Sequence, residues 1–271
     1  MIQKENNQVA VEYKQRISNV VEGRRVLLPA NYKRDYSFYH GSEGWGLCIN
    51  QPYLTRVTPK PHPPLSFRDA LKFYMGDAFE KGIIERSERI FVDNIGLQPD
   101  DYIPNKYLRE LKATHKSIEG FIPEWWWIDQ NKAYCYSTER TQSEIVALFW
   151  AGNLMSYTPW GIKELNKMKE GKFKWNGTIY FQGLTYNPID VKAWSMEYTH
   201  HELQNNWEYL KERIEYLKYC VEHKTPPSKE RIEERLPHDN DKYWLCKSAN
   251  SRCKWTDYCP YYAKYVNGDS Y

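Results

Sequence analysis

The sequence lacks any long apolar run. No stretch approaches the roughly 20 apolar residues of a membrane-spanning helix, and no basic-then-apolar leader stands at the N-terminus. Internal repeats and low-complexity segments are also missing. These absences predict a chain without a membrane segment and, by default, a cytoplasmic location.

Cysteine is scarce and the net charge is small. Six cysteines in 271 residues are too few and too scattered for a disulfide scaffold, and in a reducing compartment clustered cysteines indicate metal sites. A formal net charge of +3 permits nucleic-acid binding without arguing for it, because local patches decide such binding. The basic stretch Lys163–Lys174 and the group Arg24, Arg25, Lys33 and Arg34 are each typical of a solvated face.

Aromatic side chains are plentiful, with 23 Tyr and 11 Trp. Composition alone leaves open whether they fill a core or form surface platforms for bases. Trp125, Trp126 and Trp127 stand in a row at the start of a predicted helix. Consecutive helical residues cannot all face the core, so at least one of the three should be exposed or line a groove. Stacking on an unpaired base and a plain corner of the core are both compatible with this triplet.

The length is that of one large domain, and the element pattern predicts an α/β fold. We divide residues 1–271 into a polar, aromatic and irregular segment (1–65), a central core (66–196), and a long helix with a cysteine-rich tail (197–271). The predicted elements are a helix after Ser66, strands over RIFVDNI (from Arg89) and KYLRELKAT, a helix from Pro123 to Tyr134, a strand over SEIVALFW, a Lys-rich helix, strands around TIYFQGL and DVKAWSM, and a helix from Glu197 to about His223. This order predicts helices flanking a short mixed sheet.

Charged residues mark the second predicted strand and the turn before it. Pro99-Asp100-Asp101 is followed by Glu110-Leu111-Lys112, and residues two apart on a strand share a face, so Glu110 and Lys112 point the same way. A metal held by Glu110 and an Asp of the turn would offset the cost of burying these charges. Mg²⁺ and Mn²⁺ prefer such oxygen ligands and support phosphodiester hydrolysis. Taken alone, the motif also fits an exposed Glu–Lys pair on an edge strand.

Further features stand in order around this motif. Gln130 and Tyr134 lie four apart on a predicted helix and project from one face, and Glu80 lies on the helix before the first strand. The set resembles the RecB-like branch of the P-D-(D/E)-x-K nuclease superfamily. In that branch a helix bears a metal-ligating His, followed by a G-x-P-D-like turn, a (D/E)-x-K strand and a Q-x-x-x-Y helix.

The resemblance implies a role for each matching position. Glu80, which stands where the family usually has His, would be a metal ligand. Asp100, Glu110 and the Leu111 backbone carbonyl would be the others. Lys112 would assist the attacking water, and Gln130 and Tyr134 would lie beside the active site and help position DNA. Asp101 remains an alternative to Asp100, because a shift of one residue changes the face of a strand.

Three cysteines lie close together in the tail and one lies far upstream. Cys246, Cys253 and Cys259 form C-x6-C-x5-C, and Cys48 stands in GWGLCINQPY. This arrangement resembles the iron–sulfur clasp of AddB-type and CRISPR-adaptation nucleases, in which four thiolates hold a [4Fe–4S] cluster that ties the N-terminal segment to the C-terminal tail. Zinc is the alternative metal, because it also binds thiolates and the family's first gap is usually C-x2-C. Cys135 and Cys220 are expected to be buried free thiols.

The resemblance runs from Cys48 to Cys259. It implies a single nuclease domain, with a restriction-endonuclease-like mixed sheet flanked by helices and an iron–sulfur clasp. It also implies a metal-dependent DNA nuclease, an exonuclease on DNA ends or single strands, at home in a phage or mobile element and acting in the host cytoplasm. Two alternatives are an inactive DNA-binding or recombination accessory protein with this fold and a zinc-stabilised regulator that binds nucleic acid. The Asp–Glu–Lys trio favours the enzyme, since a binding module has no need of it.

Overall fold

The computed structural model describes residues 2–13, 35–58, 84, 87–114, 121–149, 179–181, 184–186, 190–236, 255 and 259–263. The helix predicted after Ser66, with Glu80, lies outside these residues, as do the Lys-rich helix, Cys246 and Cys253. No helix within the described ranges is long and apolar enough to cross a membrane.

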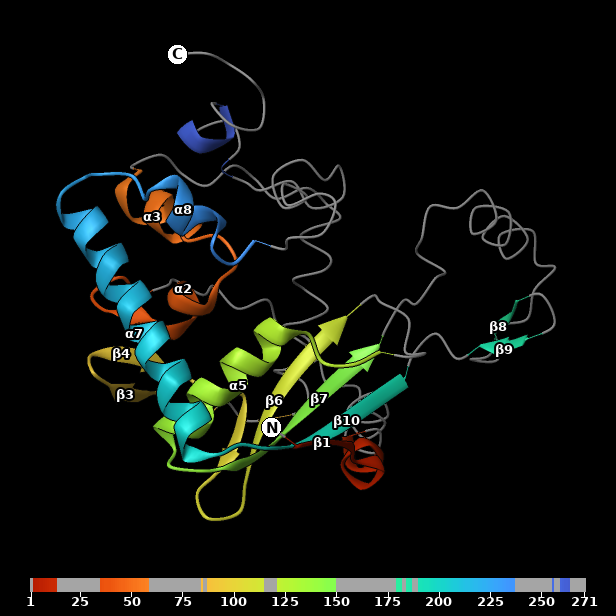
Figure 1. The fold of residues 1–271 in the computed structure, drawn as a ribbon. Helices are drawn as coiled ribbons and strands as arrows, with labels where there is room; N and C mark the ends of the chain where they lie inside the picture. Colours follow the sequence, from red (N-terminus) through yellow and green to blue (C-terminus); the bar gives the residue numbers. More distant parts are fainter. Residues whose placement is uncertain are drawn as a thin grey trace.

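A five-stranded sheet forms the centre of the molecule (Figure 1). Its strands, in spatial order, are β1 (Ile2–Glu5), β10 (Asp190–Glu197), β7 (Gln142–Phe149), β6 (Tyr107–Thr114) and β5 (Asp101–Ile103). The β6–β7 pair is parallel and the other neighbours are antiparallel. The expected α/β fold with a mixed sheet flanked by helices is therefore confirmed.

Two helices cover one face of this sheet. α5 (Trp125–Ser137) is the crossover between the parallel strands β6 and β7, and α7 (His200–Glu222) packs along α5 (Figure 1). A capping box starts α7: Thr199 Oγ1 accepts from the N–H of Glu202, whose carboxylate accepts from the N–H of Thr199. Both helices confirm the elements predicted from the sequence.

Alternate residues of β6 face two separate cores. Leu108 lies in a cluster formed by the sheet, α5 and α7, and Leu111 lies in a second cluster on the opposite face. Val9, Ala10 and Tyr13 from the helical residues 7–13 cover that second face. The segment 1–65 was expected to be irregular, and this prediction is wrong: β1 and residues 7–13 belong to the central layers. Because β1 pairs with β10 at the other end of the chain, no local pattern reveals it.

Smaller elements lie beside the α7 side of the sheet. They are β2 (Tyr39–His40), α2 (Gly41–Trp45), α3 (Asn50–Val57), β3 (Ile90–Val92), β4 (Ile95–Leu97) and α8 (Lys229–Glu233). The antiparallel pair β8 (Ile179–Phe181) and β9 (Leu184–Tyr186) lies apart from them (Figure 1). The prediction of one strand over RIFVDNI is wrong, because the segment is a hairpin of β3 and β4. Asp93 and Asn94 form its turn at φ values of 50° and 62°, a conformation that Asp and Asn tolerate better than most residues.

Candidate active site

The middle of β6 carries the predicted carboxylate and lysine, Glu110 and Lys112, at the point where β6 becomes an edge of the sheet. β5 pairs with β6 only up to Arg109. Beyond that point the N–H of Leu111 donates to Asp100 Oδ2 at 2.8 Å, so the Asp100 carboxylate takes the place that a strand carbonyl would fill. This contact fixes the turn before β5 against the middle of β6.

The choice between Asp100 and Asp101 is resolved geometrically. Asp101 is buried, accepts a hydrogen bond from the Tyr13 hydroxyl and lies 4.0 Å from the Arg109 guanidinium. Asp100 is half-buried, lies against Leu111 N and is close enough to influence Glu110 electrostatically. Asp100 is therefore the residue that the structure brings to Glu110, and Asp101 belongs to the opposite face.

Glu110 is a fully buried carboxylate with incomplete hydrogen bonding. Its side chain has no exposed surface, and its Oε2 has no hydrogen-bond partner among the described residues. Burial raises the pKa of Glu110 well above its ordinary value, the negative charge of Asp100 raises it further, and Lys112 acts in the opposite direction. Buried polar groups are nearly always paired in folded proteins, so this oxygen is open either to a proton shared with Asp100, which also raises the pKa of Glu110, or to a cation.

A chain of hydrogen bonds connects Glu110 to α5. Lys112 Nζ donates to Glu110 Oε1 and, at 2.8 Å, to Gln130 Oε1, and Gln130 Nε2 donates to the Tyr134 hydroxyl at 3.0 Å. Gln130 and Tyr134 are one helical turn apart, as the sequence predicted. An ammonium has three N–H donors, so one donor of Lys112 stays available next to the Glu110 carboxylate.

Two contacts that sequence reasoning missed hold this part of α5 in place. Asn131 is fully buried, and its Oδ1 accepts from Ser143 Oγ at 2.6 Å and from the Tyr198 hydroxyl at 2.8 Å. The Tyr134 ring packs edge-on against Trp45, with centroids 5.6 Å apart. A polar residue on the buried face of a helix was the available signal for Asn131, whereas nothing local pointed to Trp45.

The donor set fits a hard divalent cation. Asp100 and Glu110 bring carboxylate oxygens to one place, and Mg²⁺ and Mn²⁺ prefer oxygen ligands. No group of three His, Cys, Asp or Glu side chains able to hold a metal occurs in the described part of the chain. The third predicted carboxylate, Glu80, lies outside it. The Leu111 backbone belongs to the same stretch of β6, with its side chain in the second core cluster.

Two of the four cysteines predicted to bind the iron–sulfur cluster, Cys48 and Cys259, lie beside a third group of buried hydrophobic residues. Cys48 and Cys259 both pack against it, and Asn50 Nδ2 donates to Cys259 Sγ at 3.0 Å. The members of this cluster are Ile49, Tyr53, Leu54, Leu217, Cys220, Ile232, Trp255 and Tyr261. The residues around Cys48 and around Cys259 therefore meet in one core. Cys135 and Cys220 are buried free thiols, as predicted, and burial raises the pKa of Cys135 to about 12.

Comparison with known proteins adds little. No family model matches the chain, and no curated protein matches it. A solved structure titled "Crystal structure of SSO0001" aligns with 92% of this chain and 96% of its own, at 11% sequence identity and a TM-score of 0.39. A likeness at this level carries no argument, so any assignment of function depends on the geometry of the site.

Proposed function

We propose that the chain is a metal-dependent DNA nuclease that hydrolyses phosphodiesters, acting as an exonuclease on DNA ends or single strands. One observation carries the proposal: the fully buried Glu110 keeps an unpartnered oxygen beside Asp100, with the Lys112 ammonium bound to its other oxygen. A scaffold has no need for two adjoining carboxylates at a sheet edge, since leaving a buried charge incompletely paired costs several kcal/mol.

The ligands of the metal follow from this geometry and from the resemblance to RecB-like nucleases. Asp100 and Glu110 would hold Mg²⁺ or Mn²⁺, with the Leu111 carbonyl and Glu80 as further ligands by resemblance. Bound there, the ion would lower the pKa of a water and neutralise charge on the phosphate. Glu110 must be ionised to bind it, so its raised pKa makes metal affinity fall at low pH.

Lys112, Gln130 and Tyr134 would act by holding hydrogen-bond donors in fixed positions. Lys112 Nζ is fixed between Glu110 Oε1 and Gln130 Oε1, and its remaining N–H would donate to a phosphate oxygen as negative charge develops there. Gln130 holds the lysine in this orientation, and the Tyr134 hydroxyl fixes the amide of Gln130. Such preorganisation means that the donors need no rearrangement during the reaction.

We further propose that the fold is restriction-endonuclease-like and that Cys48, Cys246, Cys253 and Cys259 hold a [4Fe–4S] cluster or, as the alternative, zinc. The shared core beneath Cys48 and Cys259 supports this. A cluster closing so long a loop would contribute its binding energy to folding. Cys48→Ala should lose iron and melt at a lower temperature, whereas Cys135→Ala should keep its iron. Full iron content and normal melting of Cys48→Ala would refute the clasp.

The nuclease assignment is tested by cleavage of end-labelled single- and double-stranded DNA with Mn²⁺, Mg²⁺ or EDTA, using protein purified anaerobically. We expect metal-dependent cutting, with a loss of about 100-fold or more in Lys112→Ala. Lys106→Ala, an exposed lysine in the turn before β6, is the matched control and should cut normally.

The alternative function predicts another outcome. A folded, iron-containing wild type that binds DNA but cuts no substrate would be an accessory protein, with the Asp–Glu–Lys trio retained without catalysis. A folded wild type that neither binds nor cuts DNA would refute both assignments.

A further inference from the structure

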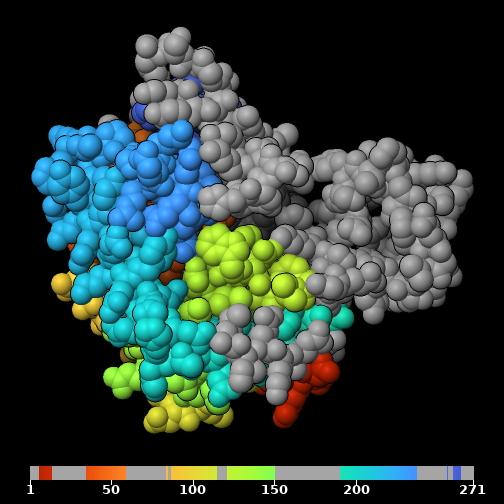
Figure 2. Space-filling view, viewed as in Figure 1, coloured from red at the N-terminus to blue at the C-terminus, as the bar shows by residue number. Residues whose placement is uncertain are grey.

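The first turn of α5 exposes apolar surface that the active site does not use. Trp125 is 41% exposed and Ile122, three residues earlier, is 69% exposed, whereas Trp127 is buried. The expectation that one tryptophan of the triplet would be exposed is thus confirmed. Figure 2 shows α5, in yellow-green, reaching the surface beside the blue residues that follow α7. An aromatic ring left open at such a place is typical of a binding surface.

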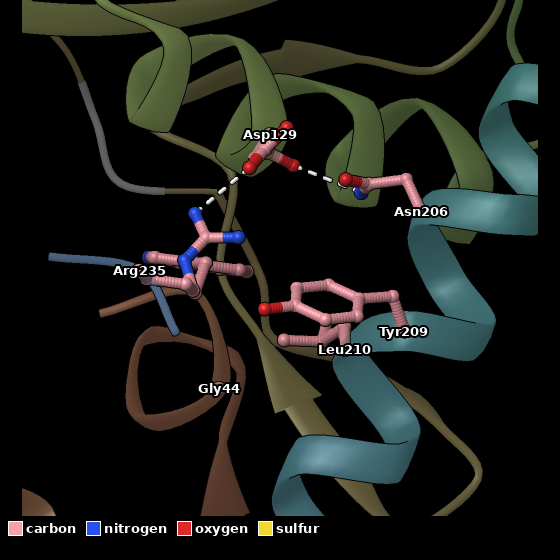
Figure 3. A pocket seen from close by; sticks show the side chains of 7 residues that line it. Gly44, Asp129, Asn206, Tyr209, Leu210 and Arg235 are labelled. Carbon is pink, nitrogen blue, oxygen red and sulfur yellow. Dashed lines mark hydrogen bonds and ion pairs between the residues drawn. The ribbon is translucent and has the colours of Figure 1, made fainter. Parts of the chain in front are cut away.

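A fixed positive charge lies against the exposed ring. The Arg235 guanidinium is 4.5 Å from the centroid of the Trp125 ring and 5.6 Å from that of Tyr209. Its Nη2 donates to Asp129 Oδ2 at 2.8 Å, and Figure 3 shows this ion pair together with Asn206, which donates to the Asp129 carbonyl. Arg235 is only 6% exposed, so it cannot swing away. It therefore supports the Trp125 ring from behind, with its own charge paired to Asp129.

The exposed Trp125 ring is connected to the candidate active site through Trp126, which is partly buried. Trp126 lies one helical turn before Gln130 and therefore shares its face, and its ring meets that of Trp125 edge-on at 5.4 Å. Gln130 in turn bonds Lys112. At about 100° per residue Trp125 projects about 140° around α5 from Gln130, so Trp126 is the tryptophan on the side of the site and Trp125 lies beyond it.

We propose that Trp125, backed by Arg235, is a stacking platform for an unpaired base of single-stranded DNA, and that Trp126 leads the strand toward Lys112. This inference rests on the proposed function and deepens it by naming the side chain that would bind an unpaired base of the substrate. Aromatic faces with adjoining arginine bind single strands without sequence preference, because every base has a π-face. In a duplex those faces are already stacked on one another, so the platform selects single strands and frayed ends.

The test is binding of a labelled oligothymidylate, followed by fluorescence anisotropy in EDTA, where metal-dependent cutting cannot occur. Trp125→Ala should weaken binding by roughly 5- to 100-fold, the fold-change that corresponds to one stacked base. Trp125→Phe should bind nearly as wild type, because it keeps an aromatic face. Phe91→Ala is the matched control, since Phe91 is 56% exposed on the β3–β4 hairpin, and it should bind normally.

A second comparison uses the wild type alone and is independent of whether Trp125→Ala folds. An abasic oligomer of the same length keeps the phosphates and loses the bases, so it should bind several-fold more weakly than oligothymidylate. Equal binding of the two oligomers, or normal binding by a folded Trp125→Ala, would overturn the proposal. A protein that binds as expected but never cuts would refute the nuclease and leave the platform standing.

Discussion

Arg109 and Glu110 are neighbours on β6 that point to opposite faces of the sheet. The charge of Arg109 is fully paired by carboxylates, whereas that of Glu110 is only partly paired. Arg109 donates to Glu144 Oε2 and Glu12 Oε1, both at 3.0 Å, and lies over the Tyr107 ring. Burial acts to lower the pKa of Arg109, but the hydrogen bonds that Arg109 donates to these carboxylates and the nearby negative charge raise it overall. Glu110 keeps one oxygen without a partner and has a carboxylate, Asp100, next to it.

We infer from this difference that the charge of Arg109 stabilises the fold and that the charge of Glu110 serves the proposed function. The Arg109 face is complete within the protein, so its ion pairs serve folding. The Glu110 face keeps an oxygen without a partner among the described residues, and in the proposed site a cation would complete it. A perturbed pKa in an unmatched cluster is the stronger sign of a site, since structural ion networks also shift pKa values.

The largest expected effect contrasts the two residues directly. Arg109→Ala should lower the free energy of unfolding by about 3–5 kcal/mol, because it leaves the buried Asp101 and the partly exposed Glu144 and Glu12 without their cation. Glu110→Gln should leave stability unchanged or raise it in EDTA, since it removes an incompletely paired charge and its amide can donate to Asp100. Urea denaturation measures both. Equal destabilisation by the two substitutions would break the distinction between the faces.

A divalent cation should stabilise only the Glu110 face. At a Mn²⁺ concentration of about 100 times its Kd, the wild type should gain roughly 2.7 kcal/mol, seen as a higher Tm by calorimetry. Asp100→Asn and Glu110→Gln should gain little, whereas Glu144→Gln should respond as the wild type does. A gain in Glu110→Gln equal to that of the wild type would place the ion elsewhere.

The free energy of unfolding should depend on pH by a smaller amount than it depends on the metal. The reason is that the positive charge of Lys112 offsets part of the cost of ionising the buried Glu110. The pKa of Glu110 is raised above its ordinary 4.5 in the folded chain, so the folded state keeps a proton that the unfolded state releases. This contribution to stability is present below pH 4.5 and is lost as the pH rises through the raised pKa. The free energy of unfolding of the wild type minus that of Glu110→Gln, measured in EDTA, should fall as the pH rises. A rise of this difference with pH would contradict the prediction.

The smallest effect concerns the end of the hydrogen-bond chain. Tyr134→Phe removes the hydroxyl that fixes the Gln130 amide, a bond worth about 1 kcal/mol. It should therefore lower kcat roughly fivefold with little change in KM. Tyr136→Phe is the control, because Tyr136 stacks on Trp207 instead. Equal kinetics in the two variants would show that the chain does not reach the reaction.

Alternation along β6 could be predicted from the sequence, because the period of a strand is two residues. Glu110 and Lys112 share a face, and the Lys112–Gln130–Tyr134 chain connects residues that the sequence had already singled out. The difference between Asp100 and Asp101 could not be predicted, because it depends on where β5 begins and on a contact of Asp101 with Tyr13, 88 residues away.

The remaining differences have the same physical origin. β1 joins the sheet through β10, a partner that no local pattern indicates. The β3–β4 hairpin depends on two consecutive residues at positive φ, whereas hydrophobic alternation alone suggested one strand. Local periodicity thus gave the long elements α5, β6, β7, β10 and α7, and failed wherever a distant contact or a turn decided the structure.

In the proposed catalytic metal site Glu110, whose Oε2 has no hydrogen-bond partner among the described residues, adjoins Asp100. The most direct measurement is Mn²⁺-dependent cleavage of end-labelled single-stranded DNA by the wild type, Glu110→Gln and Glu144→Gln. We expect Glu110→Gln to lose about 100-fold or more in rate, while Glu144→Gln, altered on the Arg109 face, keeps its activity. Cleavage by Glu110→Gln at the wild-type rate would contradict the account.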